Sequence, residues 1–393
     1  MFKRQRYLDE LIQFKDTEFI KIITGVHRCG KSCLLMLYKN YLLENGVDAK
    51  NIIYLNFEDY NTIDIQDEKT LFLYLKENSV KDQKMYFLFD EIQYVNGWQK
   101  VISSSFDSDI TIIVSNKEVL LGPLATYLSG RCIEIQMFPL SFKEFVHIKL
   151  GNHFDKRELA SYFEEYMFYG GFPAVVLSDI SMKEKILLGI FETVFLNNIY
   201  VFNKIENFNL EFLIYLISNN IGKLMSVINI VDDFKLFSKA KISVSTMLIY
   251  LKFMENFFLF YNSYYHIRGN NLMKNGSLNK SRYYIVDNGI KRIILNKKND
   301  NYVLEFENTI YIELLYRGYS VSVDNNHINK IFFAKKDYEN LHIQVIFNLS
   351  QNFHKISNFS DDYYKKMIIV NESVNQTEFE GIPIVNVIDW LME

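Results

Sequence analysis

The first 150 residues alternate between short apolar runs and longer segments with helical spacing. Five runs have the length and the β-branched or aromatic content of buried strands: residues 19–24, 52–57, 85–89, 110–114 and 133–137. Runs that are apolar almost without interruption are typical of strands covered on both faces of a parallel sheet. The alternation therefore predicts an α/β fold in which a parallel sheet is flanked by crossover helices.

The pattern then changes three times, which predicts four parts: an α/β domain at 1–150, a helical extension at 151–208, a winged-helix-like module at 209–290 and a small α+β domain at 291–393. The module is inferred from three helical stretches followed by strand-like alternation, at 211–219, 226–234, 243–257, 258–267 and 281–286. The last part mixes a helix with strands, at 303–316, 320–323, 331–334 and 342–347. A turn at Gly170-Gly171-Phe172-Pro173 breaks the helical extension, and we expect this extension to cover the site described below.

Composition supports several packed domains. A chain of 393 residues exceeds one ordinary domain, and 49% hydrophobic with 23% charged residues indicates a globular protein with an ample core. The net charge of -4 gives no global sign of a nucleic-acid partner, although it leaves room for a local basic face. Three cysteines fit a reducing compartment. The sequence contains no run of eighteen apolar residues, so no membrane span is predicted. We therefore expect a cytoplasmic protein.

One segment matches G-x-x-x-x-G-K-[ST] without a mismatch: Gly25, Val26, His27, Arg28, Cys29, Gly30, Lys31 and Ser32, with Cys33 directly after it. A predicted strand precedes the segment, and a helix predicted over residues 31–44 follows it. This order aims backbone N–H groups and a helix N-terminus at a polyphosphate. The context favours a phosphate-binding loop over a surface turn that happens to spell the motif.

The residue types within the motif suggest individual roles. Gly25 and Gly30 would let the backbone approach phosphate oxygens, Lys31 would reach the β- and γ-phosphates, and the Ser32 hydroxyl would ligate Mg²⁺. His27 and Arg28 add positive charge that would either assist binding or face solvent.

An acidic pair, Asp90-Glu91, follows the most apolar strand at its carboxyl end, where open α/β sheets bind ligands. Nucleotide hydrolysis needs a carboxylate that holds Mg²⁺ and a group that orients the attacking water. We assign Asp90 to the metal and Glu91 to the water. The alternative is an acidic turn.

Two further positions are weaker candidates. The strand that ends at Val114 is followed by Ser115-Asn116, and Asn116 or Ser115 would place a polar side chain near the γ-phosphate, unless this is only a turn. Arg131 precedes the last strand and would stabilise charge on the transferred phosphate, in its own subunit or a neighbour, or would simply be solvated.

The winged-helix-like module raises the question of DNA. Its third helix carries few charges, mainly Lys252 and Glu255, whereas basic residues gather near the expected wing: Arg268, Lys274, Lys280 and Arg282. Binding of nucleic acid at physiological salt requires several phosphate contacts. A packing or partner-docking role is therefore as plausible for this module as DNA binding.

Taken with the loop, the motifs resemble a prokaryotic family of P-loop ATPases that join an AAA-type ATPase domain to a C-terminal domain of unknown function (DUF4143 type). The stretches that carry this resemblance, in order, are Phe57-Glu58-Asp59, Asp90-Glu91-Ile92-Gln93, Ser115-Asn116, Leu128-Ser129-Gly130-Arg131, the 139–145 segment, Gly170-Gly171-Phe172-Pro173 and Asp287-Asn288-Gly289. The resemblance implies binding of ATP, hydrolysis with Mg²⁺, a sheet with an additional strand and a central loop strand, and a nucleotide-controlled switch.

The C-terminal part of that family resembles a restriction endonuclease fold. Glu307 and Gln344-Val345 match it, but Ile331 stands where the metal-binding Asp is expected and Asn329 replaces an acid. Because Mg²⁺ requires oxygen ligands, we predict that the tail is not a nuclease. Ile113-Val114 also replaces the family's Thr-Gly, which predicts slow ATP hydrolysis.

The leading interpretation is therefore an ATP-binding, Mg²⁺-dependent ATPase that works as a nucleotide-controlled switch. The alternative is an ATP-regulated DNA-binding protein, and a nuclease ranks last. GTP specificity has little support because no Asn-Lys-x-Asp motif occurs: Asn116-Lys117 continues as Glu118-Val119. We expect an unidentified protein partner and leave self-association open.

Overall fold

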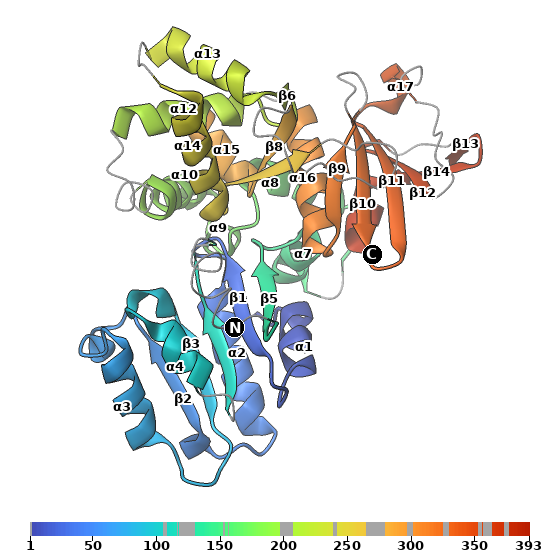
Figure 1. Cartoon of the computed structure of the whole chain (residues 1–393). Helices are drawn as coiled ribbons and strands as arrows, with labels where there is room; N and C mark the ends of the chain where they lie inside the picture. Colours follow the sequence, from blue (N-terminus) through green and yellow to red (C-terminus); the bar gives the residue numbers. More distant parts are fainter. Residues whose placement is uncertain are drawn as a thin grey trace. The chain divides into compact units, whose positions relative to one another are not determined.

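The computed structural model describes residues 2–104, 108–115, 117, 130–151, 154–155, 157–196, 207–238, 242–264, 280–296, 302–324, 330–352, 356, 364–372 and 377–393. The chain forms two compact units, of which the first comprises Met1–Phe138 with Asn256–Phe258 and the second comprises Pro139–Glu255 with Leu259–Glu393 (Figure 1). The finer division into four parts remains a prediction. Among the described residues, no helix combines the length and the apolarity needed to cross a bilayer.

The first unit is built on a five-stranded parallel sheet in the order β2-β3-β4-β1-β5. Its strands are β1 (Ile20–Gly25), β2 (Ile52–Asn56), β3 (Tyr86–Asp90), β4 (Asp109–Ile113) and β5 (Cys132–Met137). Its helices are α1 (Gln5–Gln13), α2 (Lys31–Glu44), α3 (Glu68–Asn78) and α4 (Trp98–Ser104), with single 3-10 turns η1 (Ala49–Asn51), η2 (Tyr60–Thr62) and η3 (Ile92–Tyr94). The expected parallel sheet is confirmed. Strand β4 is inserted between β1 and β3, which gives the additional strand that the resemblance implied. The loop strand β1 lies between β4 and the edge strand β5, so it is an interior strand but not the central one that the resemblance implied.

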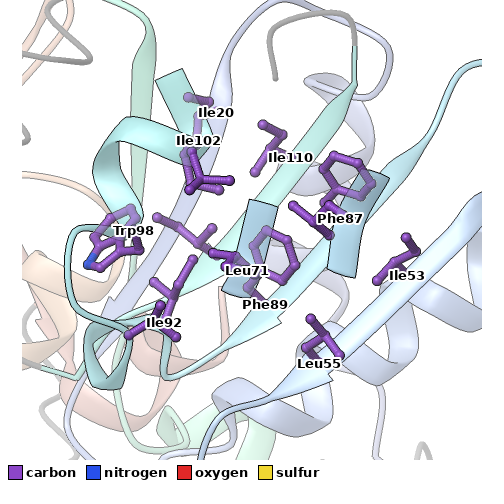
Figure 2. Packing of buried hydrophobic residues seen from close by; sticks show 14 of the residues in the cluster. Ile20, Ile53, Leu55, Leu71, Phe87, Phe89, Ile92, Trp98, Ile102 and Ile110 are labelled. Atoms are coloured by element: carbon purple, nitrogen blue, oxygen red, sulfur yellow. The ribbon is translucent and has the colours of Figure 1, made fainter. Parts of the chain in front are cut away.

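The sheet is covered on both faces, which explains why its strands are apolar almost throughout. One face packs against α3 and α4, where Leu71 and Trp98 meet strand residues such as Phe87 and Phe89 (Figure 2). Burial of this contiguous cluster fixes the register of the strands, because a shift by one residue would turn these side chains to the other face. The carboxyl ends of β1 and β3 are thereby held at one edge.

The second unit contains two sheets and many helices. The helices are α7 (Phe142–Leu150), α8 (Leu159–Tyr169), α9 (Pro173–Val176), α10 (Ile180–Ile190), the π-helical turn η4 (Phe191–Leu196), α12 (Asn207–Asn219), α13 (Val227–Ser238), α14 (Val244–Asn256), α15 (Asn288–Leu295), α16 (Val303–Tyr316), α17 (Leu349–Asn352) and α18 (Val387–Met392). A three-stranded sheet has the order β6-β8-β7, from β6 (Leu224–Met225), β7 (Phe260–Tyr264) and β8 (Ser281–Ile285). A six-stranded mixed sheet has the order β13-β14-β12-β11-β10-β9, from β9 (Ser320–Val323), β10 (Ile331–Lys336), β11 (Glu339–Ile346), β12 (Lys365–Val370), β13 (Glu378–Phe379) and β14 (Ile382–Asn386).

Two motifs of the second unit, Gly170-Gly171 and Asp287-Asn288-Gly289, prove to be one structural junction. The buried Asp287 carboxylate caps α15 and accepts the N–H of Gly171 at 2.7 Å and that of Gly289 at 2.8 Å. A Cβ on Gly170 would lie 2.0 Å from Asp287 Oδ1, and one on Gly289 would lie 2.3 Å from a backbone oxygen. The glycines are therefore required by close packing, and these motifs hold α8 against α15.

Candidate functional site

The loop between β1 and α2 has the backbone conformation that its glycines predict. Gly25 has φ +135° and Gly30 has φ +107°, and Arg28 also has a positive φ of +66°. A Cβ on Gly25 would lie only 2.1 Å from the carbonyl oxygen of Met137 at the end of β5. A residue with a Cβ at position 25 would strain its own backbone and collide with Met137, so only glycine fits there.

Lys31 is the first residue of α2 and is buried. Its ammonium donates to the carbonyl oxygens of Gly25 at 2.9 Å and Val26 at 3.1 Å, so it folds back over the loop. It also lies 3.9 Å from Glu91 Oε1, at the end of the neighbouring strand β3. The structure therefore brings the lysine of the loop and the acidic pair to the same edge of the sheet.

Asp90 ends strand β3 and is 1% exposed. Burial raises the pKa of its carboxyl, while a hydrogen bond from the Ser32 hydroxyl opposes the increase. Tyr54 on β2 donates to Asp90 Oδ2 at 3.5 Å, and Oδ1 is buried without a hydrogen-bond partner. An unsatisfied carboxylate oxygen beside a hydroxyl is a donor set that suits Mg²⁺, so these residues fit the metal predicted for them.

Glu91 has a left-handed backbone conformation (φ +54°, ψ +47°), which is unusual for a residue with a side chain. Its carboxylate accepts hydrogen bonds from Ser115 Oγ and Gln93 Nε2. Burial acts to raise its pKa, but the Lys31 charge and these two donors outweigh burial, and the pKa is lowered. Glu91 is therefore ionised at neutral pH and held in one orientation by polar neighbours.

The other loop residues differ in exposure. His27 Nδ1 lies 4.0 Å from Glu91 Oε1, and burial together with the Lys31 charge lowers the pKa of His27 to about 4, so its imidazole is neutral at pH 7. Arg28 is exposed, in agreement with the solvent-facing alternative. Cys29 is buried, whereas Cys33 is exposed on the first turn of α2. The two thiols therefore face different environments.

The two weaker candidates have different outcomes. Asn116 lies outside the described residues, but its neighbour Ser115 is buried beside Glu91 and takes the polar position expected for this strand end.

Arg131 directly precedes β5, at the amino end of this strand, whereas the loop lies at the carboxyl ends of the strands. Its carbonyl accepts the Ile20 N–H at the amino end of β1, whereas Gly25 pairs with Met137 at the carboxyl end. Five residue steps of about 3.3 Å separate Ile20 from Gly25, roughly 16 Å, which exceeds the reach of one side chain. The expectation that Arg131 contacts a phosphate bound in its own subunit is therefore wrong.

Sequence reasoning missed three residues that contact the site. Gln93 lies in the Asp90-Glu91-Ile92-Gln93 stretch, and a polar residue two positions after Glu91 was a usable signal for its contact with that carboxylate. Tyr54 alternates with buried residues on β2, and this pattern indicated only that its side chain lies on the other face of the strand from theirs. Arg4 looked like part of a basic N-terminus, and no sequence signal could have shown that it is buried against the loop.

Comparisons with known proteins agree with the first unit. The family model described as AAA domain matches residues 17–146, and that of a domain of unknown function (DUF8612) matches residues 160–301. The DUF4143 and endonuclease-like character expected for the C-terminal part is not confirmed, because the domain that matches is a different one and ends before the six-stranded sheet begins.

Similarity over most or all of the chain extends to two proteins. An uncharacterized protein of Haemophilus influenzae is 42% identical over 402 residues, covering 100% of this chain and 99% of that protein. The uncharacterized protein MJ1544 of Methanocaldococcus jannaschii is 30% identical over 334 residues, covering 81% of this chain and 70% of that protein.

Two solved structures are similar at lower levels. The Walker-type ATPase of Pyrococcus abyssi aligns with a TM-score of 0.49 and 13% identity, covering 75% of this chain and 96% of that one. AMPPCP-bound DnaA from Aquifex aeolicus aligns with a TM-score of 0.32 and 14% identity, covering 64% of this chain and 86% of that one. Both TM-scores are below 0.5, so the inference of nucleotide chemistry depends on the AAA domain and on the site itself.

Proposed function

We propose that this chain, which belongs to a P-loop ATPase family with members in Haemophilus influenzae and Methanocaldococcus jannaschii, binds ATP with Mg²⁺ at residues 25–32 and hydrolyses it slowly as a nucleotide-controlled switch. The observation that carries the proposal is the convergence of Lys31, Asp90 and Glu91 at one edge of the sheet, beside the loop. Two chain segments that are about sixty residues apart, the loop and the end of β3, supply this arrangement, which a chance motif would not produce.

Each residue has a role that its surroundings support. The loop N–H groups and the α2 N-terminus would bind the phosphates, and Lys31 would exchange the carbonyls of Gly25 and Val26 for phosphate oxygens. Ser32 and Asp90 would hold Mg²⁺, which neutralises charge on the phosphates. Glu91 would orient the attacking water, since it is ionised and can accept the proton.

The orientation of Glu91 also supports slow turnover. Its carboxylate is held by Ser115 and Gln93, so it must exchange at least one of these hydrogen bonds to bind a water molecule. Hydrogen bonds to a charged acceptor contribute about 1.5 to 3 kcal/mol each. A partner or a conformational change that weakens this hold would accelerate hydrolysis, which is the behaviour of a switch.

The test measures ATP binding and phosphate release with Mg²⁺ on the full chain, beside three variants. Lys31→Ala should abolish binding, and Glu91→Gln should bind ATP without releasing phosphate. Glu58→Gln is the matched control, because it removes the same charge from an exposed residue that follows β2 on the same sheet edge. Normal phosphate release by Glu91→Gln would show that the assignment of Glu91 is wrong, and absence of ATP binding by the wild type would refute the proposal.

A second candidate function, ATP-regulated DNA binding, has one observation in its favour. The order α12-β6-α13-α14-β7-β8 with the sheet order β6-β8-β7 is that expected for a winged helix.

The charges within this module argue against DNA. Arg282, one of the four basic residues that could contact phosphates near the expected wing, is 1% exposed and lies 3.7 Å from Glu307, so its side chain is not available to DNA. Lys252 pairs with Glu255 at 3.5 Å. Arg268 and Lys274 lie outside the described residues, and Lys280 is exposed. We therefore expect that fluorescence anisotropy detects no binding of a DNA duplex at salt concentrations of about 50 to 200 mM. Binding whose affinity falls steeply over this range would instead favour the DNA-binding alternative.

The six-stranded sheet does not carry a nuclease site in our proposal. Glu307 pairs with Lys330 at 2.9 Å and accepts the Tyr284 hydroxyl at 2.8 Å, so cations and a donor of the protein itself neutralise it. Ile331 is buried in β10 opposite Gln344, where the missing acid would stand. Cleavage of plasmid DNA by the purified chain with Mg²⁺ or Mn²⁺, abolished in Glu307→Gln, would contradict this.

A further inference from the structure

Arg4 is a buried cation directly behind the phosphate loop. It precedes α1 and is 5% exposed, which is rare for arginine. Its Nη1 donates to the carbonyl oxygen of Cys29, inside the loop, at 3.1 Å and to that of Phe138 at 2.7 Å. One nitrogen of Arg4 therefore joins the loop to the end of β5.

Neighbouring contacts reinforce this connection within the first unit. The guanidinium carbon of Arg4 lies 4.8 Å from the centre of the Tyr7 ring, and the Tyr7 hydroxyl accepts the Phe138 N–H at 3.2 Å. The Cys29 thiol donates to the Met137 carbonyl at 3.7 Å. The back of the loop is thus attached to β5 by two side chains, while its front is left to the phosphates.

The geometry of the peptide bond gives this attachment a direction. In a planar trans peptide the C=O of one residue and the N–H of the next point to opposite sides. Fixing the Cys29 carbonyl toward Arg4 therefore turns the Gly30 N–H away from Arg4, to the side on which the loop would hold a phosphate. A neutral or shorter side chain would leave this peptide free to rotate, because Gly30 restricts its own backbone least of all residues.

We propose that Arg4 is a positioning residue for nucleotide binding: it orients the Cys29–Gly30 peptide toward the phosphates and ties the loop to Phe138. Phe138 is the residue at which the first unit ends before the chain continues at Pro139. The proposal rests on the proposed function, since it requires that the loop bind a nucleotide.

The test compares ADP affinity and urea unfolding of the wild type with those of Arg4→Met, Arg4→Lys and Lys3→Met at 20 °C. ADP is chosen because it cannot lose a γ-phosphate during the measurement. Arg4→Met keeps the apolar volume and removes every donor, so ADP should bind about tenfold more weakly. Arg4→Lys should restore most of the affinity, because a single nitrogen makes both bonds. Lys3→Met loses the same charge at an exposed position and should bind ADP like the wild type.

The outcomes separate the two proposals. Failure of the wild type to bind ADP refutes the proposed function itself. If Arg4→Met is less stable in urea yet binds ADP with unchanged affinity, Arg4 is only structural and the inference is wrong. Should Arg4→Met not fold, Arg4→Gln, which keeps one N–H₂ donor, carries the same test with a loss of roughly threefold, and unchanged affinity there overturns the inference equally.

Discussion

Substitution of Gly25 by alanine tests the loop geometry directly. Gly25 has φ +135°, a conformation that residues with a Cβ almost never adopt. The added Cβ would lie 2.1 Å from the Met137 carbonyl oxygen and 3.0 Å from its carbon. Both atoms belong to the backbone of β5, so no side-chain rotation relieves the contact, and the loop or the strand must move.

The two effects set the expected magnitude. Backbone strain at such an angle costs about 1 to 3 kcal/mol, and forcing a methyl group into packed surroundings costs about 1 to 3 kcal/mol more. We therefore expect Gly25→Ala to lower the free energy of unfolding of the first unit by about 4 kcal/mol. That is a large part of the roughly 5 to 15 kcal/mol that stabilises a domain.

The assay exploits the two tryptophans of the chain. Trp98 belongs to the core of the first unit, so in a Trp390→Phe background its fluorescence reports urea unfolding of that unit alone. Gly46→Ala is the matched control: it also has a positive φ, +86°, but its Cβ would meet no atom within 4 Å, and it should cost about 1 kcal/mol. Equal stabilities of the Gly25 and Gly46 variants would refute the reasoning.

Three further predictions concern buried groups. Burial raises the pKa of Asp287 from 3.8 to about 6, so between these pH values the folded state holds a proton that the unfolded state has lost. The free energy of unfolding of the wild type should therefore fall by about 3 kcal/mol as the pH rises through this window. Asp287→Asn has no such group, so urea unfolding at pH 4 and 7 should show its stability rising by that amount relative to the wild type. Lys21→Met should cost about 3 to 5 kcal/mol in urea, because it strands buried Asp109, and Lys21→Met with Asp109→Leu should recover most of it. Iodoacetamide should label exposed Cys33 but not buried Cys29 in peptide mass spectrometry, and equal labelling would contradict the loop geometry.

Much of the first unit could be predicted because its elements depend on local pattern. The apolar runs located all five strands within two residues, and helix α2 has the predicted bounds of Lys31–Glu44. In the second unit, α16 (Val303–Tyr316) also has its predicted bounds. The order of the strands could not be predicted in the same way: the alternation predicted parallel strands, whereas the additional strand between β1 and β3 followed only from the family resemblance.

The wrong expectations share a physical cause. Arg131 stands next to a strand in sequence, but the function of a flanking residue depends on which end of the strand it occupies, and parallel strands place only their carboxyl ends at the site. Arg282 was counted among the basic residues near the expected wing because arginine is usually exposed, yet it is buried and Glu307 on α16 compensates its charge. Arg4 was overlooked for the same reason. Long-range pairing of charges leaves no local pattern in a sequence.

The environment of Glu91 changes how slow hydrolysis should be explained. From the sequence, slow hydrolysis was attributed to Ile113-Val114 in place of Thr-Gly. Both side chains are buried in the core at the end of β4. The contacts of Glu91 offer a more direct cause, since the carboxylate that must bind water is held by Ser115 and Gln93. Ser115→Ala should therefore not simply impair the enzyme: removing one donor should weaken the hold on Glu91 and raise phosphate release per bound ATP, whereas a Ser115 that contacts the γ-phosphate would give a loss. The sign of the change in single-turnover rate decides between a restraining and an assisting serine.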